Sequence, residues 1–105
     1  MTHYEATKVV IITEKLILDQ VTRLIESAGG KGYTITAAGG KGSRGVRSTN
    51  RAVVVDEFRN VKIEVITGSI NAANKIADEV AECFFENYSG ITYLEQVQIL
   101  RPHKF

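Results

Sequence analysis

The chain has 105 residues, of which 44% are apolar and 24% charged, and its formal net charge is +1. This length suits one small domain, and we expect residues 1–105 to form it. The small net charge argues against electrostatic binding of nucleic acid. A single cysteine excludes an internal disulfide framework, and no apolar run approaches the roughly 20 residues of a membrane-spanning helix. We therefore expect a cytoplasmic protein that reaches a membrane only through a partner.

The first part of the chain predicts a strand, a helix and a second strand. Residues 8–13 form a β-branched, nearly continuous apolar run, which is typical of a buried strand. Apolar side chains beginning with Leu16 then recur at helical spacing over residues 14–28. Thr13 is the expected cap of this helix, and a Gly-Gly pair follows its end. Residues 32–38 alternate loosely, as a strand does.

The second part predicts the same kinds of element. Residues 60–67 alternate cleanly, Ser69 opens a second amphipathic helix, residues 87–90 form a turn, and residues 91–100 form a last strand. The order β-α-β-loop-β-α-β predicts an α+β, ferredoxin-like fold. In that fold a four-stranded antiparallel sheet carries both helices on one face.

A loop rich in glycine and basic residues separates the two parts. Residues 39–51 contain four of the nine glycines and four of the thirteen basic residues, and they contain no acidic residue. Glycine lets the backbone approach a ligand closely, and Lys and Arg donate to anionic oxygens. We therefore expect this loop to hold a phosphate through Lys41, Arg44 and Arg47.

Two common phosphate motifs do not fit this loop. It contains a G-x-G-x-x-G pattern, but the β-branched run after it shows no helical periodicity, and a dinucleotide site needs a helix there. Lys41 is followed by Gly42 rather than by Ser or Thr, which excludes a Walker P-loop. A solvated, flexible hairpin remains the alternative to a phosphate-binding loop.

Other candidate sites are weaker. His3 and His103 lie near the termini without metal-ligand spacing, so we expect surface histidines and no metal. Cys83 is expected to be a small packed side chain, and Phe84 and Phe85 to contribute to the core and to a subunit contact. No pair of catalytic carboxylates is evident. An RNA-recognition module needs stacking aromatics on its central strands, and residues 61–67 offer none.

Several motifs resemble one known family. The sequences KVVIITEK, GGKGSR, VRS and YSGITY, which begin at Lys8, Gly39, Val46 and Tyr88, are similar to the SbtB family of PII-like carbon-regulatory proteins of cyanobacteria. The resemblance implies a homotrimer with a ferredoxin-like fold that binds adenine nucleotides (cAMP, AMP, ADP or ATP) between subunits. It also implies a T-loop, here about residues 40–59, that docks onto the sodium-dependent bicarbonate transporter SbtA.

The resemblance also assigns residues to the two loops that flank such a cleft. A B-loop, here about residues 87–91, would face the base of the T-loop across the nucleotide. The residues implied to contact the nucleotide are Gly40, Lys41, Gly42, Ser43, Arg44, Arg47, Tyr88, Ser89 and Gly90. Those implied to contact the transporter are Ser48, Asn50, Arg51, Val53, Val54 and Phe58.

Two departures from related proteins limit what is carried over. SbtB-type chains often carry a C-terminal extension with a cysteine pair, which residues 101–105 do not contain, so we expect neither redox control nor enzymatic activity. Nitrogen-regulatory PII proteins have a longer, lysine-containing B-loop and a T-loop tyrosine, and this chain has neither. A slow ATP/ADP phosphohydrolase and a standard nitrogen sensor remain the alternatives.

Overall fold

The computed structural model describes residues 2–39 and 58–101. Strand β1 is followed by a short 3-10 helix, η1, then helix α1 and strand β2; after the undescribed segment come β3, α2 and β4. Their bounds are β1 Tyr4–Glu14, η1 Lys15–Ile17, α1 Leu18–Ser27, β2 Thr34–Ala38, β3 Asn60–Thr67, α2 Ile70–Phe84 and β4 Gly90–Ile99.

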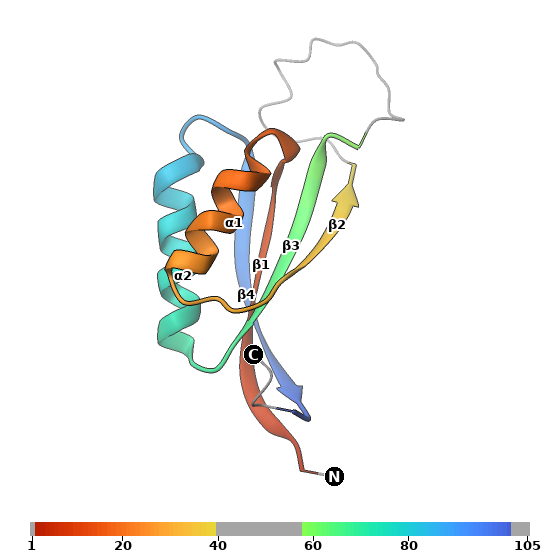
Figure 1. Ribbon diagram of the computed structural model, residues 1–105, viewed down its shortest axis with the longest axis vertical. Helices are drawn as coiled ribbons and strands as arrows, with labels where there is room; N and C mark the ends of the chain where they lie inside the picture. The colour runs from red at the N-terminus through yellow and green to blue at the C-terminus, as the bar shows by residue number, and fades with distance from the viewer. Residues whose placement is uncertain (1, 40–57, 102–105) are drawn as a thin grey trace.

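The four strands form one antiparallel sheet in the order β2-β3-β1-β4. Both helices pack on the same face of this sheet, and α1 lies beside α2 (Figure 1). The chain therefore has the ferredoxin-like fold that its element order predicts. Strands β1 and β3 lie in the centre of this sheet, with a partner strand on each side. They contain more β-branched residues than β2 or β4, and such residues pack well on a covered sheet surface.

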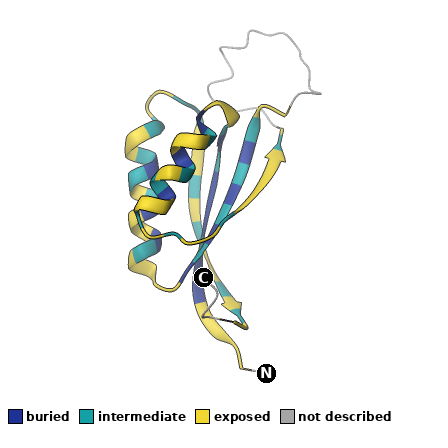
Figure 2. Cartoon of the chain, viewed as in Figure 1, coloured by how far each residue is buried: buried dark blue, intermediate teal, exposed yellow. Residues whose placement is uncertain are grey.

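The core lies between the sheet and the two helices (Figure 2). Strand β3 alternates as predicted: Val61, Ile63 and Val65 are buried, and the residues between them are only partly buried. Ile25 of α1 and Ile76 of α2 belong to the same buried cluster. Period-two alternation on the strands and period-3.6 spacing on the helices together produce this single apolar layer.

Strand β1 begins earlier than the sequence predicts. It pairs with β3 from Thr7 onwards, but its pairing with β4 starts at Tyr4. The residues before Lys8 are not continuously apolar, so the apolar run does not reveal this extension. Pairing with one neighbouring strand is sufficient to extend it.

The first helix also differs from its prediction. Glu14 is the last residue of β1, and a 3-10 turn precedes α1. Thr13 does not cap the helix, because it lies in β1 and its hydroxyl donates to the carbonyl of Ser89 at 2.8 Å. Leu16 is 73% exposed and does not belong to the core. The 3-10 turn has a different period from an α-helix, so the helical spacing that places Leu16 on the buried face does not hold there.

Two other predicted helix boundaries, the end of α1 and the start of α2, are confirmed. At the end of α1, Gly29 has a φ of 103°, and the amides of Gly29 and Gly30 donate to the carbonyls of Glu26 and Ile25 at 3.2 and 2.8 Å. This is a Schellman motif, which favours glycine at the left-handed position. At the start of α2, Ser69 Oγ accepts from the Ala72 amide at 3.1 Å and so caps the helix.

The end of α2 contains three residues for which the sequence predicts burial or packing, and the prediction for Cys83 is wrong. Cys83 is exposed, not packed, because it lies on the solvent side of α2. Phe84 and Phe85 are half-buried and pack against the core cluster, as expected. Within residues 2–39 and 58–101, neither helix has the length and apolar character that crossing a membrane would require.

Candidate functional site

The two ends of the undescribed segment lie together at one end of the sheet (Figure 1). Ala38, the last residue of β2, pairs with Asn60, the first residue of β3. The ring of Phe58 lies against Gly39, where an added β-carbon would be 3.0 Å from Phe58 Cδ1. The predicted T-loop therefore leaves and re-enters the fold at adjacent points.

The end of β1 and the first residue of η1 contact the two predicted loops. The amide of Lys15 donates to the carbonyl of Arg59, at the end of the T-loop, at 2.8 Å. In the B-loop, the Ser89 amide donates to Glu14 Oε2 at 2.7 Å, and the Ser89 carbonyl accepts from Thr13 at 2.8 Å. Three consecutive residues thus join the B-loop to the base of the T-loop.

The predicted B-loop residues are placed by the end of α2. The amide of Tyr88 donates to the Phe84 carbonyl at 2.9 Å, and the Tyr88 side chain packs against the core. Gly90 follows Ser89 and begins β4, opposite Thr13 of β1. Tyr88, Ser89 and Gly90 therefore lie at the same end of the sheet as the stems of the T-loop.

Most of the predicted T-loop residues lie outside the described part of the chain. Of the partner-binding residues only Phe58 is described, and its side chain is 58% exposed. The predicted residues outside the described ranges are Gly40, Lys41, Gly42, Ser43, Arg44, Arg47, Ser48, Asn50, Arg51, Val53 and Val54.

A hollow of about 520 Å³ opens beside the T-loop stems. Its walls are mainly apolar and include Leu18, Ile35 and Phe58, and its polar groups come from Lys15 and Asn60. Ile35 and Phe58 are both exposed although large and apolar. Among the residues that the structure describes, the hollow thus combines apolar walls with the cation of Lys15, beside the stems of the predicted phosphate-binding loop.

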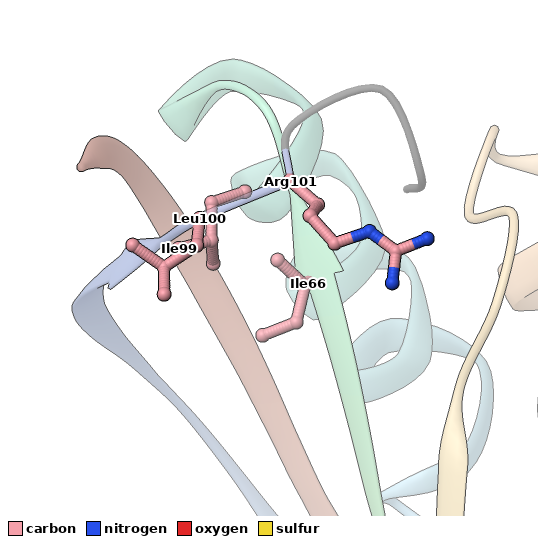
Figure 3. A pocket seen from close by; sticks show the side chains of 4 residues that line it. All are labelled: Ile66, Ile99, Leu100 and Arg101. Atoms are coloured by element: carbon pink, nitrogen blue, oxygen red, sulfur yellow. The ribbon is translucent and has the colours of Figure 1, made fainter. Parts of the chain in front are cut away.

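A second hollow, of about 380 Å³, lies at the opposite end of the sheet, where β3 and β4 finish (Figure 3). Ile66, Ile99 and Leu100 form apolar walls, and Arg101 adds a guanidinium group. The sequence does not predict this site, because Arg101 follows the last strand with no motif around it. Arg101 and Ile66 lie far apart in the sequence and come together only in the folded chain (Figure 3).

The sheet face opposite the helices carries a charged cluster. Lys8 Nζ lies 3.2 Å from Glu95 Oε1 and 3.5 Å from Glu64 Oε2, and Lys62 Nζ lies 3.7 Å from the same Glu64 oxygen. The hydrogen bond to Glu95, together with the charge of Glu64, raises the pKa of Lys8 above its ordinary value despite partial desolvation. This lysine is therefore neutralised by carboxylates and is not a free site for anions.

Comparisons with known proteins agree with this architecture. The family model for nitrogen regulatory protein P-II matches residues 6–104. The chain belongs to the PII family. Within residues 2–39 and 58–101 this PII protein has no group of three or more His, Cys, Asp or Glu side chains placed to hold a metal ion.

Solved structures of similar proteins include PII-like members from two bacteria. A PII-like signalling protein of Thermus thermophilus is 30% identical, with 99% of this chain and 98% of the other covered and a TM-score of 0.79. The PII-like protein CPII of Thiomonas intermedia, solved bound to ADP, AMP and acetate, is 28% identical over 100% and 98% of the chains, with a TM-score of 0.78.

A further CPII structure, bound to ADP and bicarbonate, is 30% identical over 99% and 97% of the chains, with a TM-score of 0.80. The chain is thus a PII-like signalling protein, of a family of regulatory proteins, and its likeness to these structures extends over its whole length.

Proposed function

We propose that this PII-like protein binds adenine nucleotides in clefts between its subunits and transmits their binding through the T-loop. The observation that carries the proposal is the connection of the two loops by Thr13, Glu14 and Lys15. A nucleotide phosphate held by Arg44 and Arg47 on the T-loop would lie next to a B-loop that is hydrogen-bonded to the same strand end. The nucleotide complexes of CPII support the same class of ligand.

A homotrimer is part of this proposal, and one surface supports association. Leu94 packs against the core, so Ile91 and Tyr93, which alternate with their neighbours along β4, face away from the helices. Ile91 is 57% and Tyr93 39% exposed, and they pair with Ile12 and Val10 of β1. An exposed apolar strip on a sheet is a usual site of subunit contact.

The regulated process that we propose is uptake of inorganic carbon. The SbtB-like motifs point to the bicarbonate transporter SbtA as the partner of the T-loop. CPII has been solved with ADP and bicarbonate bound, and bicarbonate is the substrate of such a transporter. The protein would then be cytoplasmic and would lie at the membrane only when bound to the transporter.

Calorimetry on Arg47→Ala tests the nucleotide site. Loss of one charge-assisted hydrogen bond should weaken binding of cAMP and AMP by roughly 1.5–3 kcal/mol, or about ten- to 150-fold. Arg23→Ala, which removes an exposed arginine from α1, is the matched control and should leave affinity unchanged. Equal affinities of Arg47→Ala and the parent protein would exclude the proposed phosphate contact.

Co-purification from cells tests the partner. The protein, isolated with and without added cAMP or ATP, should retain the transporter to different extents, because a ligand shifts a loop only by unequal affinity for its conformations. Cooperative binding of 2-oxoglutarate with Mg-ATP would instead identify a standard nitrogen sensor. Phosphate release that scales with protein after stringent purification would identify a phosphohydrolase.

A further inference from the structure

Ser89 of the B-loop has both of its backbone polar groups bound by the end of β1. Its carbonyl accepts from the Thr13 hydroxyl at 2.8 Å, and its amide donates to Glu14 Oε2 at 2.7 Å. The second bond has an ionised acceptor, which makes it roughly twice as strong as a bond between neutral groups. The Ser89 amide is therefore occupied by an anion that belongs to the protein itself.

The position of Glu14 is fixed on both sides. Thr13 is buried and bound to the same residue, Ser89. The amide of Lys15 is bound to the Arg59 carbonyl, at the base of the T-loop. Because hydrogen bonds hold both of its neighbours, the backbone of Glu14 is restrained and its carboxylate is directed toward the B-loop.

A backbone amide in a loop that contains glycine is a usual donor to phosphate oxygens. With Glu14 in place, a phosphate cannot use this amide without displacing the carboxylate. A phosphate that binds beside it experiences repulsion, which grows with each further negative charge on the ligand. The carboxylate thus opposes a polyphosphate more than it opposes a monophosphate.

We propose that Glu14 is a specificity-determining residue that biases the nucleotide site against ligands with several phosphates. This inference rests on the nucleotide-binding function proposed above. AMP and cAMP, with one phosphate each, are disfavoured least by the carboxylate, and ATP is disfavoured most. The same carboxylate keeps the B-loop attached to β1 while the site is empty.

Glu14→Gln tests the proposal, because glutamine has nearly the same shape and still offers an oxygen to the Ser89 amide. Calorimetry with AMP and ATP should show ATP affinity rising about three- to tenfold more than AMP affinity, as expected from removal of one nearby charge at moderate dielectric. Glu82→Gln makes the same charge change on α2, at an exposed side chain without a hydrogen bond or ion pair among the described residues. This control should leave the ratio of the two affinities unchanged.

Glu14→Ala separates charge from a purely structural role. If the charge sets the preference, this variant shifts the ratio toward ATP at least as far as Glu14→Gln, because the Ser89 amide also becomes available. Equal weakening of both nucleotides by Glu14→Ala, with no change in Glu14→Gln, would overturn the proposal. If the parent protein binds neither AMP nor ATP, both the proposed nucleotide-binding function and this inference are wrong. If it binds both, but Glu14→Gln and Glu14→Ala leave the ratio of the two affinities unchanged, only this inference is wrong.

Discussion

The ring of Phe85 occupies the space that a β-carbon on Gly90 would need. A β-carbon built there would lie 2.6 Å from Phe85 Cζ and 3.0 Å from Cδ1, closer than carbon atoms pack. Gly90 is therefore required by the packing of α2 against the start of β4, whatever its contact with a ligand. The need for glycine at this position of the B-loop thus comes from the contact with Phe85, which the neighbouring sequence does not reveal.

Gly90→Ala should consequently lower the free energy of unfolding by about 1–3 kcal/mol, the usual cost of an overpacked site. Chemical denaturation followed by circular dichroism measures this difference. Gly32→Ala is the matched control, because a β-carbon at Gly32 has no atom within 4 Å. Equal stability of the two variants would show that Phe85 moves aside without cost.

Two Thr→Val substitutions should change stability in opposite directions. Thr92 Oγ1 is buried and has no hydrogen-bond partner among the described residues, so Thr92→Val removes an unsatisfied polar atom and should stabilise the protein by about 1 kcal/mol. Thr13 is also buried, but its hydroxyl is bound to Ser89. Thr13→Val leaves that carbonyl without its donor and should cost about 1–3 kcal/mol. Thermal unfolding of both variants tests the pair, and destabilisation by Thr92→Val would contradict the first part.

The cap of α2 makes a separate contribution. Ser69→Ala removes the acceptor for the Ala72 amide and should cost about 1 kcal/mol, as lost caps usually do. Ser27→Ala serves as control, because Ser27 Oγ donates to Leu24 O near the end of α1 and caps no amide. Its effect should stay within about 0.5 kcal/mol. Urea denaturation should resolve this difference.

The charged cluster around Lys8 should make stability fall at alkaline pH. The hydrogen bond to Glu95 raises the pKa of Lys8 in the folded protein above 10.5, so its contribution is fully present below pH 10.5. That contribution is lost as the pH rises through the folded-state pKa. The difference in unfolding free energy between the parent and Lys8→Met should therefore be constant near pH 9 and decrease above pH 10.5.

Lys75→Met is the control for this titration. Lys75 forms an i,i+4 pair with Glu79 at 3.4 Å on the exposed side of α2, and such pairs contribute only about 0.3–0.5 kcal/mol. Its effect on stability should be small at every pH. A difference for Lys8→Met that stays unchanged through about pH 11 would contradict the assigned cause.

Some features could be predicted because the chain's own neighbours produce them. The Schellman motif at Gly29 and Gly30, the Ser69 cap and the alternation along β3 depend on residues within a few positions, and all three are confirmed. Leu16 was wrongly predicted because it lies in a 3-10 turn, and Thr13 because its role depends on a distant element. Ser89 lies 76 residues from Thr13, and nothing local indicates the bond between them.

The sequence by itself determined the element order, the ferredoxin-like topology and the loop whose glycines and cations predict a phosphate site, since periodicity and composition act over short distances. Only the tertiary structure decided that the junction of β1 and η1 joins the B-loop to the T-loop base, that Arg101 lines a hollow beside Ile66, and that Glu14 occupies an amide of the B-loop. Each of these relationships joins residues that lie far apart in the sequence, and no local pattern specifies such contacts.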